Sequence, residues 1–91
     1  MLRISEIGTT KSSVTLGLEG RMTGPWVQEV RDFCEQFLSN GQHLSLDLGE
    51  LSFVDREGVN LFRNLIIRGV ALTNYSPFIA ERLKEVAAND A

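Results

Sequence analysis

The sequence predicts an α/β fold in which three helices cover a four-stranded mixed sheet, in the order β-β-α-β-α-β-α. Two short segments with alternating apolar residues open the chain, and a polar turn joins them, which is typical of a hairpin. Strand-like and helix-like apolar patterns then alternate, which favours parallel strands with right-handed crossovers. The 91 residues suffice for one compact domain and are too few for two, so we expect a single domain over residues 1–91.

The first two strands form the predicted hairpin. Leu2, Ile4 and Ile7 delimit the first strand, and the polar stretch 8–12 indicates a turn. In the second strand, apolar residues alternate with polar or small ones, so one face should be buried. The apolar positions of this second strand are Val14, Leu16 and Leu18. The first strand is expected at a sheet edge, which is compatible with a homodimer.

The first helix is predicted to begin after Thr23 or Gly24, either of which can be its N-cap, with Pro25 in the first turn. Residues 40–41, Asn-Gly, should end it. One apolar stripe at helical spacing should pack in the core, and it comprises Trp26, Val30, Phe33, Cys34, Phe37 and Leu38. A ligand-stacking role for Trp26 is the alternative to a core position.

The next strand and helix follow the same logic. The strand is marked by Leu44, Leu46 and Leu48, and Asp55 then suits the N-cap of a second helix, with Glu57 favourably placed in its first turn. Gly69 should end this helix. Its predicted buried stripe is Val59, Phe62, Leu65 and Ile66, and the apolar residues outside that stripe are Leu61 and Ile67.

The last elements are a short strand over residues 70–72, of the kind buried on both faces, and a third helix. Ser76 is its expected N-cap and Pro77 its first residue. The helix should turn Ile79, Leu83 and Val86 inward. Residues 87–91 are small and polar, and we expect them to fray.

Composition excludes several classes of function. Nine Lys and Arg residues against twelve Asp and Glu residues give a net charge of −3, which lacks the positive surface that binds nucleic acid. The single cysteine, Cys34, cannot form an internal disulfide, which fits a reducing compartment. No apolar run approaches the roughly 20 residues of a membrane helix, and no signal-peptide pattern opens the chain. We therefore expect a cytoplasmic location without membrane insertion.

No constellation of residues predicts catalysis. Cys34 and the lone His43 form neither a metal-ligand set nor a nucleophile–base pair. No glycine-rich phosphate loop is present. The carboxylates of Glu50, Asp55 and Glu57 are close in sequence, but nothing indicates the buried pair that acid–base catalysis requires. The sequence therefore predicts no enzyme activity, no cofactor and no metal.

Three segments together carry a family resemblance. Residues 46–59 contain a strand with Asp47, a short connection and the tetrapeptide Asp-Arg-Glu-Gly, which leads into a helix. Residues 18–24 and 69–77 match the expected segments before the first and third helices. In this order and spacing they resemble the STAS (sulphate transporter and anti-sigma factor antagonist) family over residues 2–86. The sequence ends before the further strand and helix common in that family, as in the short STAS subunits of lipid-transport ATPases.

The resemblance implies a fold but not the usual switch. STAS proteins often carry Asp-Ser-Ser-Gly, and a partner kinase phosphorylates the first serine to change partner affinity. Here Asp55 and Gly58 match that pattern, whereas Arg56 occupies the phosphoacceptor position and Glu57 the second serine position. Arginine carries no hydroxyl, so phosphorylation at residues 55–58 is not expected. Candidate acceptors elsewhere are Ser52, Thr23 and Ser76.

The resemblance further implies a non-catalytic, protein-binding regulatory module. The expected docking surface, with the segment 22–24 as an addition, comprises Asp55, Arg56, Glu57, Gly58, Asn60, Leu61, Arg63 and Asn64. Four of these residues also have a purely structural interpretation. Asp55 would then be an ordinary N-cap, and Gly58 would be required because the turn leaves little room for a side chain. Arg56 and Glu57 would belong to a solvated charged loop. The expected partner is an anti-sigma or kinase-like protein. The alternatives are a small subunit of an ABC-type lipid transport complex and a small-ligand or nucleotide binder.

Overall fold

The computed structural model describes residues 2–89, with side chains through residue 84. Within this range the chain forms four strands and three helices in the predicted order, which confirms the fold class. The elements are β1 (Leu2–Thr9), β2 (Ser13–Met22), α1 (Pro25–Ser39), β3 (His43–Val54), α2 (Arg56–Ile67), β4 (Ala71–Thr73) and α3 (Pro77–Asn89). The predicted inward position of Val86 concerns a side chain outside the described ones, and the expected fraying of 87–91 extends beyond the described residues, so neither prediction is tested.

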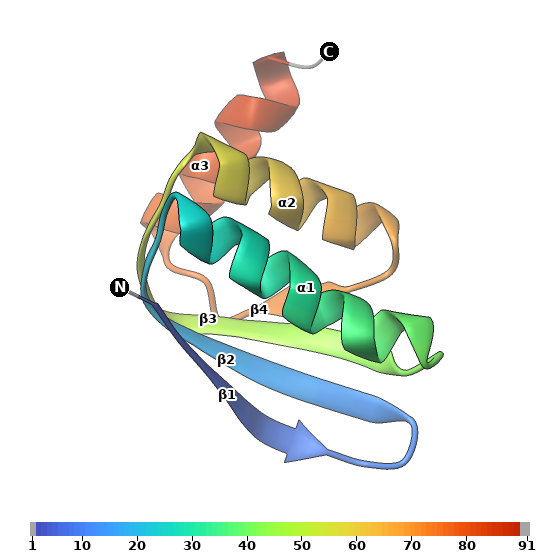
Figure 1. The fold of residues 1–91 in the computed structure, drawn as a ribbon. Helices are drawn as coiled ribbons and strands as arrows, with labels where there is room; N and C mark the ends of the chain where they lie inside the picture. The colour runs from blue at the N-terminus through green and yellow to red at the C-terminus, as the bar shows by residue number, and fades with distance from the viewer. Residues whose placement is uncertain (1, 90–91) are drawn as a thin grey trace.

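The sheet is mixed and has α1 and α2 on one side. Its order is β1-β2-β3-β4, with β1 antiparallel to β2 and the other two pairs parallel. Figure 1 shows α1 and α2 side by side over one face, and α3 packs against α2. Successive right-handed crossovers that advance in one direction place their helices on the same side. In the part of the chain that the structure describes, α1 and α2 leave the opposite face uncovered, and we call it the open face (Figure 1).

The core lies between the sheet and the helices. The alternation predicted for β2 is confirmed, because Val14, Leu16 and Leu18 are each only 1% exposed. Leu46 and Leu48 of β3 are fully buried, and their neighbours in β2 and β3 point to the open face. Apolar burial of this extent is the main source of stability for a domain of this size.

The helix boundaries follow from the predicted capping signals. Gly24 precedes α1 with a φ of 54°, a backbone conformation that favours glycine, so it takes the N-cap position in place of Thr23. Pro25 is the first residue of α1, as predicted. The Ser76 hydroxyl accepts the Ile79 N–H at 3.3 Å, and Pro77 begins α3, which confirms the third capping prediction.

The buried face of α2 differs from its predicted stripe. Leu61 is only 3% exposed, whereas Ile66 is 49% exposed, so the prediction is wrong for both residues. The sheet covers one side of α2 and α3 packs against another, so the buried arc of this helix is wider than a stripe that faces the sheet alone. The buried arc is also displaced relative to the predicted stripe, since Ile66 and Ile67 in the last turn of α2 lie at the surface.

One further prediction needs correction. β4 is an edge strand with Ala71 and Thr73 exposed, and therefore is not buried on both faces. Its single pairing partner within the described residues is β3, and an edge strand of three residues receives little cover. Trp26 packs against the core, as predicted, but is only half-buried, and the neighbouring Val27 takes the fully buried position at the start of α1. Cys34 is buried, as predicted.

An ion pair joins the two helices that cover the sheet. The Arg68 guanidinium, just after α2, binds the Glu35 carboxylate of α1, and its hydrogen bonds hold the pKa of Glu35 below its usual value. Both side chains are exposed, so this pair contributes little to stability.

No helix in residues 2–89 is long and apolar enough to cross a bilayer.

We predict that Cys34 is chemically inert in the folded protein. Burial, assisted by the Glu35 carboxylate, raises the pKa of its thiol from 9.0 to about 12. The thiolate is the form that attacks a disulfide reagent and displaces its leaving thiolate, so at pH 8 an aromatic disulfide reagent should modify the protein only after unfolding in urea. Rapid modification of the native protein would contradict the buried position.

The same shift predicts a pH dependence of stability. The pKa of Cys34 is higher in the folded protein than in the unfolded chain, so its contribution to the free energy of unfolding is fully present below pH 9. It is lost between about pH 9 and 12, because there the thiol ionises in the unfolded chain but not in the folded protein. The free energy of unfolding should therefore fall with pH in this window. In the Cys34→Ala variant that decrease should be smaller, whatever the variant's absolute stability.

Candidate functional site

Asp55 joins the end of β3 to the beginnings of both α1 and α2. Its N–H donates to the Met22 carbonyl at 3.1 Å. One carboxylate oxygen, Oδ1, accepts the Gly58 N–H at 2.8 Å, which confirms the predicted N-cap of α2. The other oxygen, Oδ2, accepts the Gly24 N–H at 3.0 Å. One side chain therefore satisfies N–H groups at two helix N-termini that have no partner inside their own helices.

The register of the sheet explains this meeting of segments. β2 and β3 are parallel neighbours, and Met22 pairs with Val54, so both strands end at the same edge. Gly58 allows the close approach, because a Cβ on this residue would lie 2.5 Å from Val54 Cγ2 and 3.5 Å from the Met22 carbonyl oxygen. Gly58 is buried and hence shapes the turn rather than presenting a surface to a partner.

The exposed residues of α2 form a polar surface. Arg56, Glu57, Asn60 and Asn64 are all exposed and follow each other at helical spacing, and we call these four the α2 surface. Glu57 lies in the first turn, as predicted, where its charge opposes the positive helix end. Arg63 is half-buried. Leu61 is buried, so its predicted place on an exposed docking surface is wrong.

The first turns of α1 extend this surface. A hollow of about 290 Å³ lies between the two helices and is lined by Gly24, Val27, Gln28, Arg31, Glu57 and Asn60. Arg31 donates to the Gln28 side-chain oxygen at 3.0 Å, and Gln28 donates to Asp32 at 2.8 Å. The sequence prediction missed Gln28 and Arg31. Their positions off the apolar stripe signalled exposure, but only the placement of α1 beside α2 brings them to this site.

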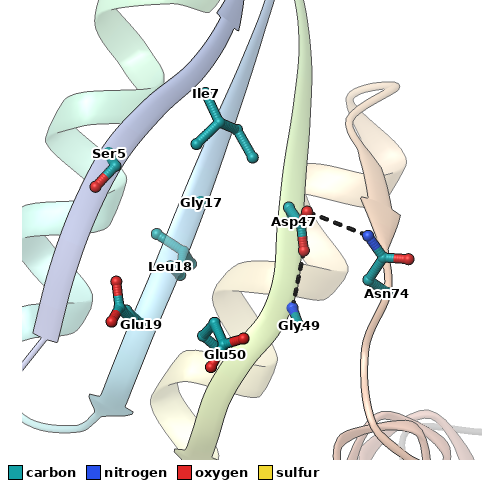
Figure 2. Close-up of a pocket in the computed structure, with 9 residues that line it drawn as sticks. All are labelled: Ser5, Ile7, Gly17, Leu18, Glu19, Asp47, Gly49, Glu50 and Asn74. Carbon is teal, nitrogen blue, oxygen red and sulfur yellow. Dashed lines mark hydrogen bonds between the residues drawn. The ribbon is translucent and has the colours of Figure 1, made fainter.

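A second hollow, of about 330 Å³, lies on the open face and is shown in Figure 2. Asp47, Glu19 and Glu50 line it, and both carboxylate oxygens of Asp47 already have partners. Oδ1 accepts the Gly49 N–H at 2.9 Å, and Oδ2 accepts the Asn74 side-chain amide at 3.1 Å (Figure 2). Asn74 has a φ of 57°, which asparagine tolerates. These bonds hold the segment after β4 against β3, which is a structural role.

Two observations concern the chemistry of the side chains in the described residues. No group of three or more His, Cys, Asp and Glu side chains among them is arranged to hold a metal ion. The Cys34 thiol is buried, and its raised pKa keeps it protonated.

The comparison with solved structures supports the family resemblance at the level of fold. The chain is similar to the anti-sigma factor antagonist SpoIIAA in its unphosphorylated form, with a TM-score of 0.69 over 90% of this chain and 82% of that chain. The two sequences are 21% identical, so this likeness shows the fold. The chain thus has the STAS-like fold of an anti-sigma factor antagonist. No protein-family model and no curated protein matches the sequence.

We predict that replacement of Asp55 destabilises the protein. Asp55→Ala removes an N-cap, worth about 0.5–2 kcal/mol, and leaves the Gly24 N–H without its acceptor. The free energy of unfolding in urea should fall by about 1–3 kcal/mol. Asp55→Asn keeps one carbonyl acceptor and should cost less. Arg56→Ala, at the exposed next position, is the control and should stay within about 0.5 kcal/mol of the wild type.

A second substitution tests the tight turn. Ala is normally preferred to Gly in a helix by up to about 1 kcal/mol, yet Gly58→Ala should destabilise because the new Cβ meets the buried Val54 side chain. We expect a loss of about 1–3 kcal/mol in urea unfolding. Asn64→Ala, at an exposed position of the same helix, should be neutral or slightly stabilising. Equal stability of the two variants would refute the predicted clash.

Proposed function

We propose that the chain is a non-catalytic, cytoplasmic protein-interaction module with a regulatory role of the anti-sigma factor antagonist kind. The docking site is the α2 surface together with Gln28 and Arg31 of α1. The observation that carries this proposal is the Asp55 carboxylate, which ties the starts of both helices to the end of β3. Because the two helices cannot shift independently there, the charged residues around them form a preorganised surface, and preorganisation lowers the entropic cost of binding.

Permanent charge distinguishes this proposed site from a phospho-switched one. Arg56 is exposed at the first position of α2, where the STAS resemblance places a phosphoacceptor serine. Its side chain has no hydroxyl, so this position cannot be switched by a kinase. Regulation would act elsewhere. Among the three candidate acceptors, Ser52 is exposed and donates to the Gly20 carbonyl at 2.9 Å, whereas Thr23 and Ser76 are half-buried.

The proposed partner is a protein of the anti-sigma or kinase-like class. SpoIIAA is itself an anti-sigma factor antagonist, and its fold is the one that this chain shares. Self-association is a separate expectation, and it is supported by the position of β1 at an edge of the sheet. Neither role requires a cofactor.

Capture of the partner tests the proposal. The immobilised chain should retain a specific protein from a lysate of its source cells, and the triple variant Arg56→Ala, Glu57→Ala, Asn60→Ala should lose most of it. Lys11→Ala is the control, because Lys11 is exposed in the turn between β1 and β2, at the opposite end of the sheet (Figure 1). Circular dichroism verifies that each variant is folded.

The result decides between the open alternatives. Mass spectrometry that identifies a kinase or anti-sigma factor supports the proposal, and an ATPase or permease would assign the chain to a transport complex instead. Retention of the same proteins by the triple variant and by the wild type would exclude the α2 surface as the docking site.

A further inference from the structure

We infer that the docking surface continues from the Asp55 turn onto the open face of the sheet, where Arg21, Phe53 and Phe78 receive a partner segment that pairs an acidic side chain with an apolar one. This inference rests on the proposed function and adds the chemistry of the partner. We call these three residues the aromatic–arginine site.

The three side chains stack in one row. Arg21 and Phe53 are directly opposite each other in the parallel register of β2 and β3. The Arg21 guanidinium carbon lies over the Phe53 ring, 4.9 Å from its centroid. Phe78, in the first turn of α3, stacks on the same ring with centroids 6.2 Å apart and an interplanar angle of 29°. The row thus combines residues from two strands and a helix.

Arg21 is prepared to bind an anion. It is exposed, and in the described part of the chain its one recorded interaction is with the Phe53 ring, with no ion pair to a carboxylate. A guanidinium held over a ring still has N–H donors at its edge, and these match the two oxygens of a carboxylate. Contact with the ring restricts the side chain before binding, so less conformational entropy is lost when an anion arrives.

The apolar half of the site is incomplete without a partner. Phe78 is 48% exposed and Tyr75, three residues earlier, is 45% exposed. Phe53 between Arg21 and Phe78 is half-buried. Partly exposed aromatic rings beside an arginine have the composition that dominates binding energy at protein interfaces. An aliphatic side chain placed on the Phe78 ring would remove apolar surface from water.

The site is continuous with the Asp55 turn. Arg21 precedes Met22, whose carbonyl accepts the Asp55 N–H, and Phe53 lies two residues before Asp55. One partner segment can therefore contact Arg56 on α2 and Arg21 on the open face. The Asp55 carboxylate is already engaged by Gly24 and Gly58, and on α2 the exposed Glu57 follows Arg56, so Arg21 is the cation that the aromatic–arginine site itself presents. Charge complementarity favours an acidic segment over a basic one.

Peptide titration followed by ¹⁵N NMR tests this inference on the intact chain. The probe is acetyl-Glu-Glu-Leu-Leu-Glu-Glu-amide, and the matched controls replace either all Glu by Lys or both Leu by Ser. We expect the acidic–apolar peptide to shift the Arg21 side-chain N–H and the backbone amides of Phe53 and Phe78. Each control peptide should bind about tenfold more weakly, because it lacks one of the two complementary features.

Variants of the protein sharpen the test. Arg21→Gln and Phe78→Ser should each weaken binding by about fivefold to tenfold. Arg21→Lys, which keeps the charge but loses the planar donor fork, should also weaken it. Arg3→Gln removes another exposed arginine, from β1, and should leave binding unchanged. The NMR spectra show whether each variant is folded. If Phe78→Ser unfolds, the Arg21→Lys variant still tests the site. Equal binding of the Lys-containing peptide, or shifts mapped to other residues, would overturn the inference.

The two proposals can fail separately. If the triple variant on α2 loses its protein partner but the acidic peptide does not bind at Arg21 and Phe78, the aromatic–arginine site is refuted and the interaction module stands. If the peptide binds there as expected while the chain captures no protein, the aromatic–arginine site is supported and the proposed regulatory function is refuted.

Discussion

The Asp55 carboxylate is the interaction on which the geometry of this molecule depends. Two parallel strands end at one edge of the sheet, and each is followed by a helix whose first N–H groups have no partner within it. Asp55 supplies both acceptors, one for Gly24 before α1 and one for Gly58 in α2. A single side chain therefore fixes the relative positions of two helices, and the absence of a side chain at Gly58 makes the approach sterically possible.

A sheet with helices on one side has two surfaces of different character. The helix side buries the leucine and valine side chains of β2 and β3, whereas the open face carries the alternate residues of the same strands. The Asp55 turn lies where these two surfaces meet. The α2 surface begins on one side of it, and the stacked row of Arg21, Phe53 and Phe78 lies on the other. A partner that binds at the turn is thus near Arg56 on the helix side and near Arg21 on the open face.

Much of the fold could be predicted because its signals are local. Alternation in β2, the helix start at Pro25 and the caps at Asp55 and Ser76 each depend on a few neighbouring residues, and all are confirmed. Burial was predicted less well where it depends on packing against an element that is distant in the sequence. Leu61 lies inside because α2 is covered by α3 as well as by the sheet, and β4 is partly exposed because it ends the sheet.

Adjacent residues were enough to predict the order of elements, the turn at Asp55 and the exposed charges of Arg56 and Glu57, because periodicity and capping are local properties. Which segments meet at that turn depends instead on how the strands and helices pack. The bond from Asp55 to Gly24 spans 31 positions, and the stacking of Phe53 with Phe78 depends on where α3 begins relative to β3. Such contacts follow from the register of parallel strands and the packing of helices, which no local pattern specifies.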